Sequence, residues 1–249
     1  MKAGILTDLT KCIGCKACAI NCKQINNLPG GVAEQLDAYT WTVVEKRRGI
    51  YVRRQCMHCL EPTCVSVCPV GALSRSKYGA VVYDAGKCIG CRYCVMACPF
   101  DVPKYQWDSR SPLVGKCILC TEKRLKHGEQ PACSEVCPTG ATIFGDRDAL
   151  ISEARRRIKN NPSRYINKIY GFKEAGGTSV MYLSSVPFEQ LGFKDGLRSE
   201  AYPELTWKMM KEVPLIGGVG SAALFGVMWV INRRIEMKRQ KPDAGKDEA

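Results

Sequence analysis

The longest apolar stretch of the chain lies near its C-terminal end. From Pro214 to Ile231 about 18 residues follow one another without a charged side chain, which is the lower end of the length that crosses a bilayer core. A buried core helix is the alternative. Basic residues crowd directly after the stretch and Trp229 lies near its end, as in membrane anchors. We therefore expect one transmembrane helix in 207–235 and a basic-to-polar tail over 236–249.

The charges that flank this helix give it a direction. Arg233, Arg234 and Lys238 follow the apolar stretch, and basic residues stay on the cytoplasmic side of a membrane. Lys208 and Lys211 on the other flank weaken the asymmetry without reversing it. The C-terminus is thus expected in the cytoplasm, and the residues before the helix in the periplasm or its equivalent.

The residues between 146 and 206 show two further local patterns. Asp146 is a candidate N-cap for a helix through Lys159, whose apolar residues fall on one side. The run Val180 to Leu183 predicts a short strand. The rest of 146–206 is loop-rich, and we expect it to wrap the preceding domain or to contact a partner. Plain packing is the alternative.

Small residues recur along the apolar helix. Gly218, Ala222 and Gly226 are spaced four apart, so they fall on one face of a helix and let another helix approach closely. This spacing predicts docking of a membrane partner. The tail from Asp243 to Ala249 is polar and is expected to be disordered.

Cysteine content changes the picture of the first 145 residues. The chain has 16 cysteines among 249 residues, and all fall in tight clusters. Disulfides suit short secreted chains with scattered cysteines, and the run Met1 to Leu6 is too short for the apolar core of a signal peptide. The competing causes are therefore zinc and iron–sulfur clusters.

The cysteines form four motifs of four. The motifs are Cys12-x2-Cys15-x2-Cys18-x3-Cys22, Cys56-x2-Cys59-x4-Cys64-x3-Cys68-Pro69, Cys88-x2-Cys91-x2-Cys94-x3-Cys98-Pro99, and Cys117-x2-Cys120 followed after a long gap by Cys133-x3-Cys137-Pro138. The first and third match the run of bacterial ferredoxins, in which three cysteines hold one [4Fe–4S] cluster and the fourth reaches another. Zinc ribbons use pairs of Cys-x2-Cys and have no reason to repeat this run.

The number of cysteines matches the number of ligands that four clusters require. Four motifs of four ligands predict four [4Fe–4S] clusters with no cysteine left over, so no iron is left open for substrate chemistry. We therefore expect a chain that conducts electrons and is not itself catalytic. No Gly-x-Gly-x-x-Gly nucleotide fingerprint follows a strand.

Net charge agrees with this interpretation. The formal net charge is +13, and four clusters with their thiolates would contribute about −8, because thiolate is the ligand form. The basic residues therefore compensate the cofactors, and no basic–aromatic platform for nucleic acid accompanies them. We expect no nucleic-acid partner.

Spacing alone does not pair the motifs. A ferredoxin-like pair joins one motif of each type, which allows one with four and two with three, or one with two and three with four. The linkers between motifs are too similar in length to decide.

Several segments carry a resemblance to a known family. They are Gln55-Cys56-Met57-His58-Cys59, Cys64-Val65-Ser66-Val67-Cys68-Pro69, Gly90-Cys91-Arg92-Tyr93-Cys94, Pro103-Lys104-Tyr105 and Gly176-Gly177-Thr178. The chain resembles, over roughly its whole length, the four-cluster electron-transfer (beta) subunits of the molybdopterin oxidoreductase family, closest to the iron–sulfur subunits of hydrogenase 2 and membrane-bound formate dehydrogenase. The run Val186-Pro187-Phe188-Glu189 looks more like the hydrogenase type.

The resemblance implies a nested ligand arrangement. The implied sets are Cys12, Cys15, Cys18 with Cys137; Cys22 with Cys117, Cys120, Cys133; Cys56, Cys59, Cys64 with Cys98; and Cys68 with Cys88, Cys91, Cys94. It also implies an α+β fold of two nested, pseudo-symmetric bacterial-ferredoxin-like lobes over 1–145. The inner lobe, about 50–105, is inserted in the outer lobe, and a loop-rich wrap and one C-terminal transmembrane helix follow.

The same resemblance implies partners and a role. The chain would relay electrons in anaerobic respiration between a large catalytic subunit, of molybdenum/tungsten-pterin or NiFe type, and an integral membrane cytochrome b or quinone-binding subunit. It would be exported folded, attached to a partner that carries the signal. The alternatives are a polyferredoxin that acts with soluble donors, or a membrane-anchored structural or sensing module.

Four polar residues near the motifs are further candidates. His58 and His127 could tune a cluster potential by hydrogen bonding or bind haem, but ordinary packing or solvation is the more frequent role. Lys116 and Arg92 neighbour ligands and could raise a potential through their charge, with solvated charge as the alternative.

Overall fold

The computed structural model describes residues 2–31 and 33–239, and the chain divides into two compact units, residues 1–203 and 204–249. The strands are β1 (Ala3–Asp8), β2 (Thr42–Arg47), β3 (Ile50–Gln55), β4 (Leu73–Arg75), β5 (Val81–Tyr83), β6 (Lys104–Tyr105), β7 (Val114–Gly115), β8 (Thr142–Asp146) and β9 (Val180–Leu183). The α-helices are α1 (Ala17–Asn26), α2 (Thr63–Ser66), α3 (Tyr93–Ala97), α4 (Ala132–Glu135), α5 (Arg147–Asn160), α6 (Tyr202–Met210) and α7 (Val213–Arg239). Short 3-10 turns lie at η1 (Ala85–Lys87), η2 (Leu125–His127), η3 (Glu174–Gly176) and η4 (Phe188–Leu191).

A three-stranded sheet in the order β8-β1-β9 organises the first unit. β1 pairs antiparallel with β8 and parallel with β9, with Ile5 opposite Phe144 and Val180. Successive side chains point to opposite faces of a strand, and here both faces are covered. Every residue of β1 is therefore buried.

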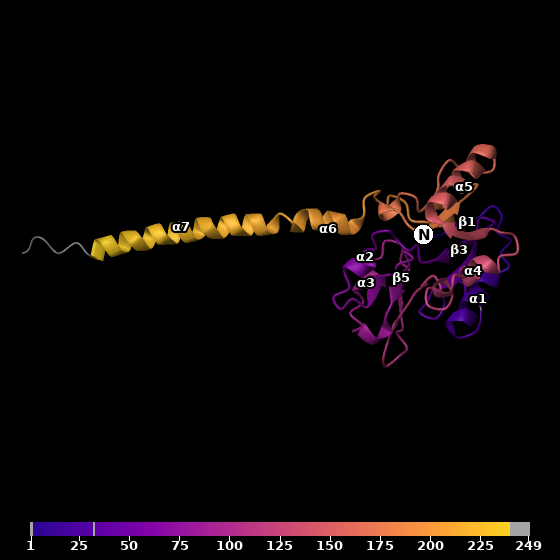
Figure 1. Cartoon of the computed structure of the whole chain (residues 1–249), viewed down its shortest axis with the longest axis horizontal. Coiled ribbons are helices and arrows are strands. Elements are labelled where there is room, and N and C mark those ends of the chain that lie inside the picture. The colour runs from indigo at the N-terminus through magenta and orange to yellow at the C-terminus, as the bar shows by residue number, and fades with distance from the viewer. Residues whose placement is uncertain (1, 32, 240–249) are drawn as a thin grey trace, which may run out of the picture. The chain divides into compact units, whose positions relative to one another are not determined.

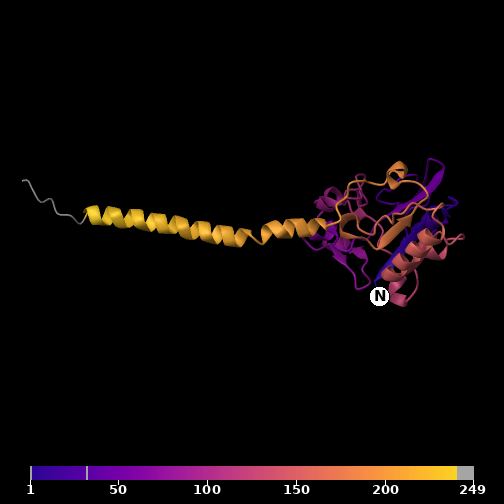
Figure 2. The same ribbon diagram turned by 90° about the horizontal axis from the view of Figure 1, so that it is seen from above.

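Two hydrophobic cores lie against the two faces of this sheet. Leu6 and Met181 pack with Leu150 and Ala154 of α5 on one face, and Figure 2 shows α5 lying along β1. The other face packs Ile5 and Tyr182 of β9 against aromatic side chains of the segments before and after β9. These aromatics are Tyr170, Phe188 and Phe193.

The expected helix after Asp146 is confirmed as α5. The side chain of Asp146 accepts a hydrogen bond from the N–H of Asp148 and so caps the helix. The strand expected over Val180–Leu183 is confirmed as β9. The loops that follow it carry aromatic side chains into the core, so this part of the segment packs against the first unit.

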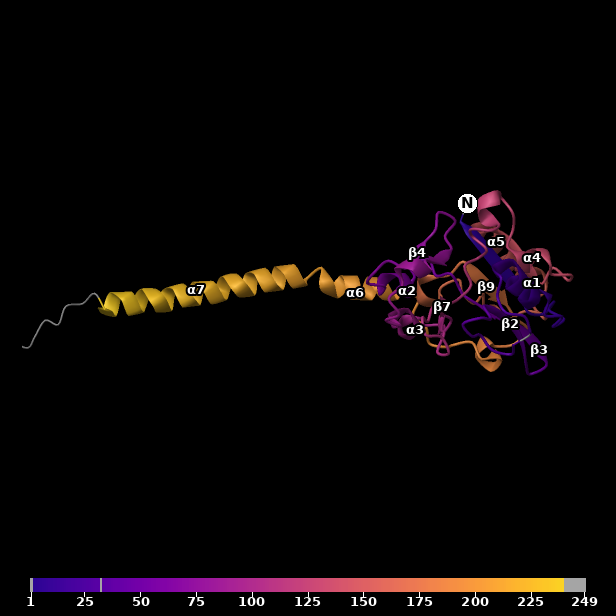
Figure 3. The same ribbon diagram turned by 90° about the horizontal axis from the view of Figure 1, so that it is seen from below.

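Short hairpins carry the rest of the first unit. β2 and β3 are joined by Arg48 and Gly49, both with positive φ (48° and 81°), as a two-residue hairpin turn requires. β4 pairs with β5 and β6 with β7, both antiparallel. Figure 1 and Figure 3 show α1 and α4 side by side, although they are about 110 residues apart in sequence. The first unit is thus a mixed α and β fold of small elements.

The second unit is helical over the residues described. α7 is long and apolar enough to cross a membrane, and its apolar window is not buried. This confirms the expected long apolar C-terminal helix. Residues 240–249, which include the tail expected from Asp243 to Ala249, lie outside the described residues.

Candidate iron–sulfur centres

The four Cys-x-x-Cys loops share one backbone feature. The residue before the second cysteine has a positive φ in each, at Gly14 (74°), His58 (48°), Gly90 (70°) and Leu119 (56°). Glycine adopts this conformation freely, whereas a non-glycine residue is strained in it. All four loops thus share this one backbone feature, including the two whose sequence lacks glycine there.

Short helices hold five of the eight remaining cysteines. Cys18 and Cys22 lie on α1, Cys64 on α2, Cys94 on α3 and Cys133 on α4. A one- or two-turn helix fixes the direction of a thiol relative to its loop, because side chains three or four residues apart share a face. The expected ferredoxin-like combination of loop and helix is therefore present at each motif.

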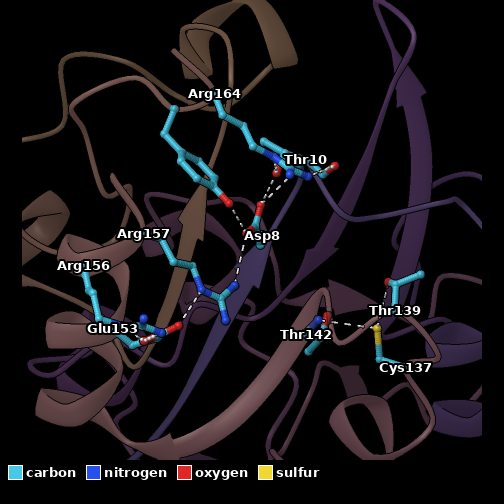
Figure 4. A network of polar contacts seen from close by, with 10 residues as sticks. Asp8, Thr10, Cys137, Thr139, Thr142, Glu153, Arg156, Arg157 and Arg164 are labelled. Carbon is cyan, nitrogen blue, oxygen red and sulfur yellow. Dashed lines mark hydrogen bonds and ion pairs between the residues drawn. The ribbon is translucent and has the colours of Figure 1, made fainter. Parts of the chain in front are cut away.

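The Cys-Pro-x-Gly-Ala segments of motifs two and four wrap a sulfur in backbone N–H groups. The N–H of Thr142 donates to Cys137 Sγ at 3.4 Å (Figure 4). Burial raises the pKa of Cys137, but N–H groups from Thr142, Thr139 and Ala141 and the Thr139 hydroxyl lower it below the ordinary thiol value. Such N–H groups favour a thiolate.

The equivalent loop of motif two behaves in the same way. Slight burial raises the pKa of Cys68, but N–H groups of Leu73, Val70, Ala72 and Gly71 bring it below the ordinary value. Gly71 and Gly140 take positive φ angles (63° and 60°) at equivalent places in the two loops. The two loops are thus matched sites for an anionic sulfur.

Other thiols lie close enough to one another to interact electrostatically, and these neighbours come from different motifs. Burial and then the charges of Cys56, Cys98 and Cys64 raise the pKa of Cys59 well above its ordinary value. Burial and then Cys88, Cys91 and Cys68 raise the pKa of Cys94 to about 11. Motifs two and three therefore meet in both of these groups.

Motifs one and four meet in the same way. Burial, and after it the neighbouring Cys133 and Cys120, raise the pKa of Cys22 to about 12. A cavity brings together the thiols of Cys12, Cys15, Cys18 and Cys137. Thiols of motif one thus have neighbours from motif four, as thiols of motif two have neighbours from motif three.

The donor set suits a cluster and its iron. All sixteen thiols are free. Where burial raises the pKa, as at Cys22, Cys59 and Cys94, bound iron must displace the proton, as metals do at coordinating thiols. Among residues 2–31 and 33–239, no three His, Cys, Asp or Glu side chains are placed to hold one metal ion. A zinc site gathers its sulfurs within about 2.3 Å of one ion, whereas a cubane binds them at separate corners.

His58 lies between two motifs and is fully buried. Its Nδ1 accepts the N–H of Val81 at 3.0 Å, so Nε2 carries the proton and donates to Cys117 Sγ at 3.5 Å. Burial and the charge of Lys116 hold the pKa of His58 well below its ordinary value, so the ring is neutral. Both ring nitrogens are occupied, which leaves no atom for a haem iron.

The other three candidates have different settings. Lys116 is buried, and its Nζ donates to the carbonyl oxygens of Val81 (2.5 Å) and Cys117 (2.9 Å). Arg92 is exposed, and its guanidinium lies over the ring of Trp107 at 5.2 Å. His127 ends η2 and is exposed. Lys116 and His58 are thus the two buried members of this set.

The sequence did not reveal two features of the site. Arg53 on β3 is buried among the thiols, and no motif marked it, because it belongs to an ordinary strand pattern. The Gly176-Gly177-Thr178 segment was singled out only for its resemblance to the family, and the structure shows that it pairs with the loop of motif two, since Leu60 N–H donates to the Gly177 carbonyl oxygen at 3.0 Å. A bridge also joins Cys59 to Thr178, so the segment closes this cluster loop.

A buried acid anchors the loop that enters motif one. Asp8 accepts hydrogen bonds from the Tyr165 hydroxyl (2.7 Å), Arg157 (3.1 Å) and the Thr10 hydroxyl (2.7 Å) (Figure 4). Asp8 ends β1 and Thr10 lies two residues before Cys12. The network therefore fixes this loop to α5 and to the segment after it.

Comparisons with known proteins agree with this geometry. Residues 48–147 match the family model of the 4Fe-4S dicluster domain. The chain is 36% identical to hydrogenase-2 operon protein HybA of Escherichia coli O157:H7, over 98% of this chain and 88% of that protein. It is 35% identical to the formate dehydrogenase-O iron–sulfur subunit of Escherichia coli K12, over 72% of this chain and 65% of that subunit.

A third relative extends the comparison. A protein of Nitratidesulfovibrio vulgaris is 40% identical, over 93% of this chain and 67% of the relative. The expected resemblance is confirmed by these matches. With its ferredoxin-like loops and free thiols, the chain belongs to the family of [4Fe–4S] iron–sulfur proteins that includes hydrogenase-2 HybA and the formate dehydrogenase iron–sulfur subunits.

Proposed function

We propose that this chain is an electron-transfer subunit that relays electrons through four [4Fe–4S] clusters. Its electrons would pass between a catalytic subunit of formate dehydrogenase or NiFe hydrogenase type and a membrane subunit that serves quinone or haem. The observation that carries the proposal is the complete set of sixteen free thiols, with a positive φ before the second cysteine of every motif. Each bound cluster supplies one-electron chemistry, and the chain supplies its burial, spacing and N–H donors.

The proposed ligand sets follow the nested arrangement. Motif one would share two clusters with motif four, and motif two would share two with motif three. Support comes from the neighbours that raise each thiol pKa, such as Cys133 beside Cys22 and Cys98 beside Cys59. The inner lobe, about 50–105, would then sit within the outer lobe of a 1–145 cluster domain.

Paired cysteine variants test this arrangement. Cys22→Ala and Cys133→Ala should each change the same electron paramagnetic resonance signal, and the double variant should change no second one. Cys12→Ala is the matched control from the same motif, and it should change a different signal. Two signals lost in the Cys22/Cys133 double variant would contradict the nested sets and leave the relay itself standing.

The count of clusters is tested on the loaded chain. Four clusters predict about sixteen iron and sixteen acid-labile sulfide atoms per chain. A content near eight of each would contradict the relay of four.

Helix α7 supports a membrane location. It has no buried residue, and a Cβ added at Gly218 or Gly226 meets no atom within 4 Å. The proposed arrangement places the cluster domain in the periplasm, the C-terminus in the cytoplasm and the small-residue face against the membrane subunit. A reporter fused to the C-terminus should be active only in the cytoplasm, and activity only outside the cell would contradict this orientation.

The proposed partners separate the relay from its alternatives. A purified membrane complex should contain a large catalytic subunit, identified by mass spectrometry, and its substrate should reduce the clusters. Clusters that accept electrons only from soluble donors would instead favour a polyferredoxin. Clusters that the purified catalytic partner cannot reduce would favour a structural or sensing module.

A further inference from the structure

Arg53 is a buried cation with no buried anion of its own. It is 1% exposed at the centre of the β2–β3 hairpin, opposite Val44. No Asp or Glu of residues 2–31 or 33–239 forms an ion pair with it. Taking a guanidinium out of water without a counter-charge is expensive, so the fold must supply negative charge in another form.

Two N–H donors at this place have no acceptor. Nη2 of Arg53 donates to the Gln55 side-chain oxygen, and Nη1 lies 3.5 Å from the Thr7 hydroxyl. Arg53 Nε and Gln55 Nε2 are both buried without a hydrogen-bond partner. Residues two apart on a strand face the same side, so the two orphaned donors belong to one surface.

The surroundings of this surface are thiols from two ligand sets. Arg53 lines the same cavity as Cys12, Cys15, Cys18 and Cys137. Burial opposes its charge, yet the thiolates of Cys133, Cys18 and Cys117 raise the pKa of Arg53 above its ordinary value. Cys133 and Cys117 belong to the set proposed with Cys22. The guanidinium thus lies electrostatically between two proposed clusters.

A cluster supplies what these donors lack. The sulfides and thiolates of a reduced cubane are large, weakly hydrated acceptors that carry negative charge, and hydrogen bonds to them are one of the protein's means of setting the potential. A fixed positive charge stabilises the more negative, reduced form more than the oxidised form. The effect falls on whichever clusters the cation faces.

We propose that Arg53, oriented by Gln55, is a shared internal cation for the two clusters of motifs one and four, and that it raises the reduction potentials of both. Arg53 is thus a positioning and tuning residue, and it moves no proton. The inference rests on the proposed function, because it requires both clusters to be reduced during the relay. It adds that these two clusters are tuned together while those of motifs two and three are tuned separately.

The test is a redox titration of the full chain in its complex, followed by electron paramagnetic resonance. Arg53→Gln removes the charge and keeps a polar side chain, and Arg53→Lys keeps the charge. We expect Arg53→Gln to shift the reduced-to-oxidised ratio of two clusters about tenfold, or about 59 mV per electron, towards lower potential. Arg53→Lys should recover much of this shift, and the other two clusters should stay unchanged.

A second variant tests the same charge effect in case Arg53→Gln does not fold. Gln55→Glu keeps the shape of the strand and places a carboxylate beside the guanidinium, so it neutralises the charge without removing the side chain. It should lower the same two potentials. Arg47→Gln is the matched control, because Arg47 is an exposed cation on the same hairpin, and it should shift no cluster.

The outcomes are distinct from failure of the relay itself. Unchanged potentials in Arg53→Gln with full iron content, or equal shifts of all four clusters, would overturn the inference while the relay stands. Loss of iron in Arg53→Gln with native potentials in Arg53→Lys and Gln55→Glu would assign Arg53 a purely structural role and also overturn it. Failure of the catalytic partner to reduce any cluster in the unaltered chain would instead defeat the proposed function.

Discussion

The hydrogen bond from His58 to Cys117 offers a sharp test of how this chain sets a potential. His58→Leu removes the ring N–H that reaches Cys117 Sγ at 3.5 Å. Leucine is tolerated in the left-handed conformation here, because Leu119 occupies the equivalent place of motif four with φ 56°. The substitution therefore changes the chemistry of the site more than its backbone.

The expected changes in reduction potential and in stability follow from the two hydrogen bonds that are lost. A hydrogen bond to a charged acceptor contributes about 1.5–3 kcal/mol. If about half of that is felt only by the reduced cluster, the loss is on the order of 1 kcal/mol, or about 40 mV for one electron. The N–H of Val81 also loses its acceptor, which costs about 1–3 kcal/mol of stability.

The assay is a potentiometric titration of the loaded chain, with thermal unfolding measured in parallel. The cluster proposed at Cys117 should be reduced at a potential about 40 mV lower, and the melting temperature should fall by about 2–4 °C per kcal/mol of lost stability. His127→Leu is the matched control, because His127 is exposed, and it should change neither quantity. The pKa of His58 lies well below its ordinary value, so no step in potential is expected near pH 6.5 in the unaltered chain.

Two results would refute the reasoning. A potential that stays within about 10 mV of the original in His58→Leu, with iron content intact, would mean that the N–H contributes nothing to the reduced state. A shift in the His127→Leu control of the same size would mean that the effect is not local.

The remaining predictions concern the scaffold. Gly115→Ala would place a Cβ against the carbonyl oxygen of Ala38, so we expect the chain to lose about 3 kcal/mol or more of stability, seen in soluble yield and iron content. Gly30→Ala, which meets no atom within 4 Å, should leave both unchanged. Asp8→Asn breaks a buried ion pair and should destabilise the chain by about 3–5 kcal/mol, seen as faster iron release on heating. Asp146→Ala removes the α5 cap and should lower the melting temperature at neutral pH. N–H groups lower the pKa of Asp146. The carboxylate therefore contributes to stability above the unfolded pKa near 3.9, and this contribution is lost as the pH falls through the lower pKa of the folded state. A loss of stability in Asp146→Ala at pH 2 as large as that at neutral pH would contradict this.

The sequence was most informative where local chemistry is decisive. The spacing of sixteen cysteines, the cap at Asp146 and the apolar run after Pro214 each depend on neighbouring residues, and the loops, α5 and α7 are present where they were expected. His58 and Lys116 were identified as candidates because they adjoin ligands. Their burial and exact partners depend on residues such as Val81, which no local pattern connects to them.

Other parts of the site depend on contacts between distant segments. Arg53 has the sequence context of a strand residue, and only the packing of β1 and motif four around β3 makes it an interior cation. The Gly176-Gly177-Thr178 segment contacts Leu60, which lies more than a hundred residues earlier in the chain. The sequence alone could not exclude that His58 binds haem. The structure excludes it, because both ring nitrogens already have hydrogen-bond partners.

The Gly176-Gly177-Thr178 segment, which closes the loop of motif two, has a consequence for biosynthesis. Thr178 bridges Cys59, yet the ribosome adds it long after the cysteine loop has emerged. Because synthesis adds about 5–20 residues per second, roughly 6–24 s pass before the segment that closes the loop is made. During that interval the thiols of motif two are open to oxidants and to scaffold proteins alike. Stable iron loading of motif two is therefore expected only after this segment has been synthesised, and a nascent chain arrested before Gly176 should carry no stable cluster there.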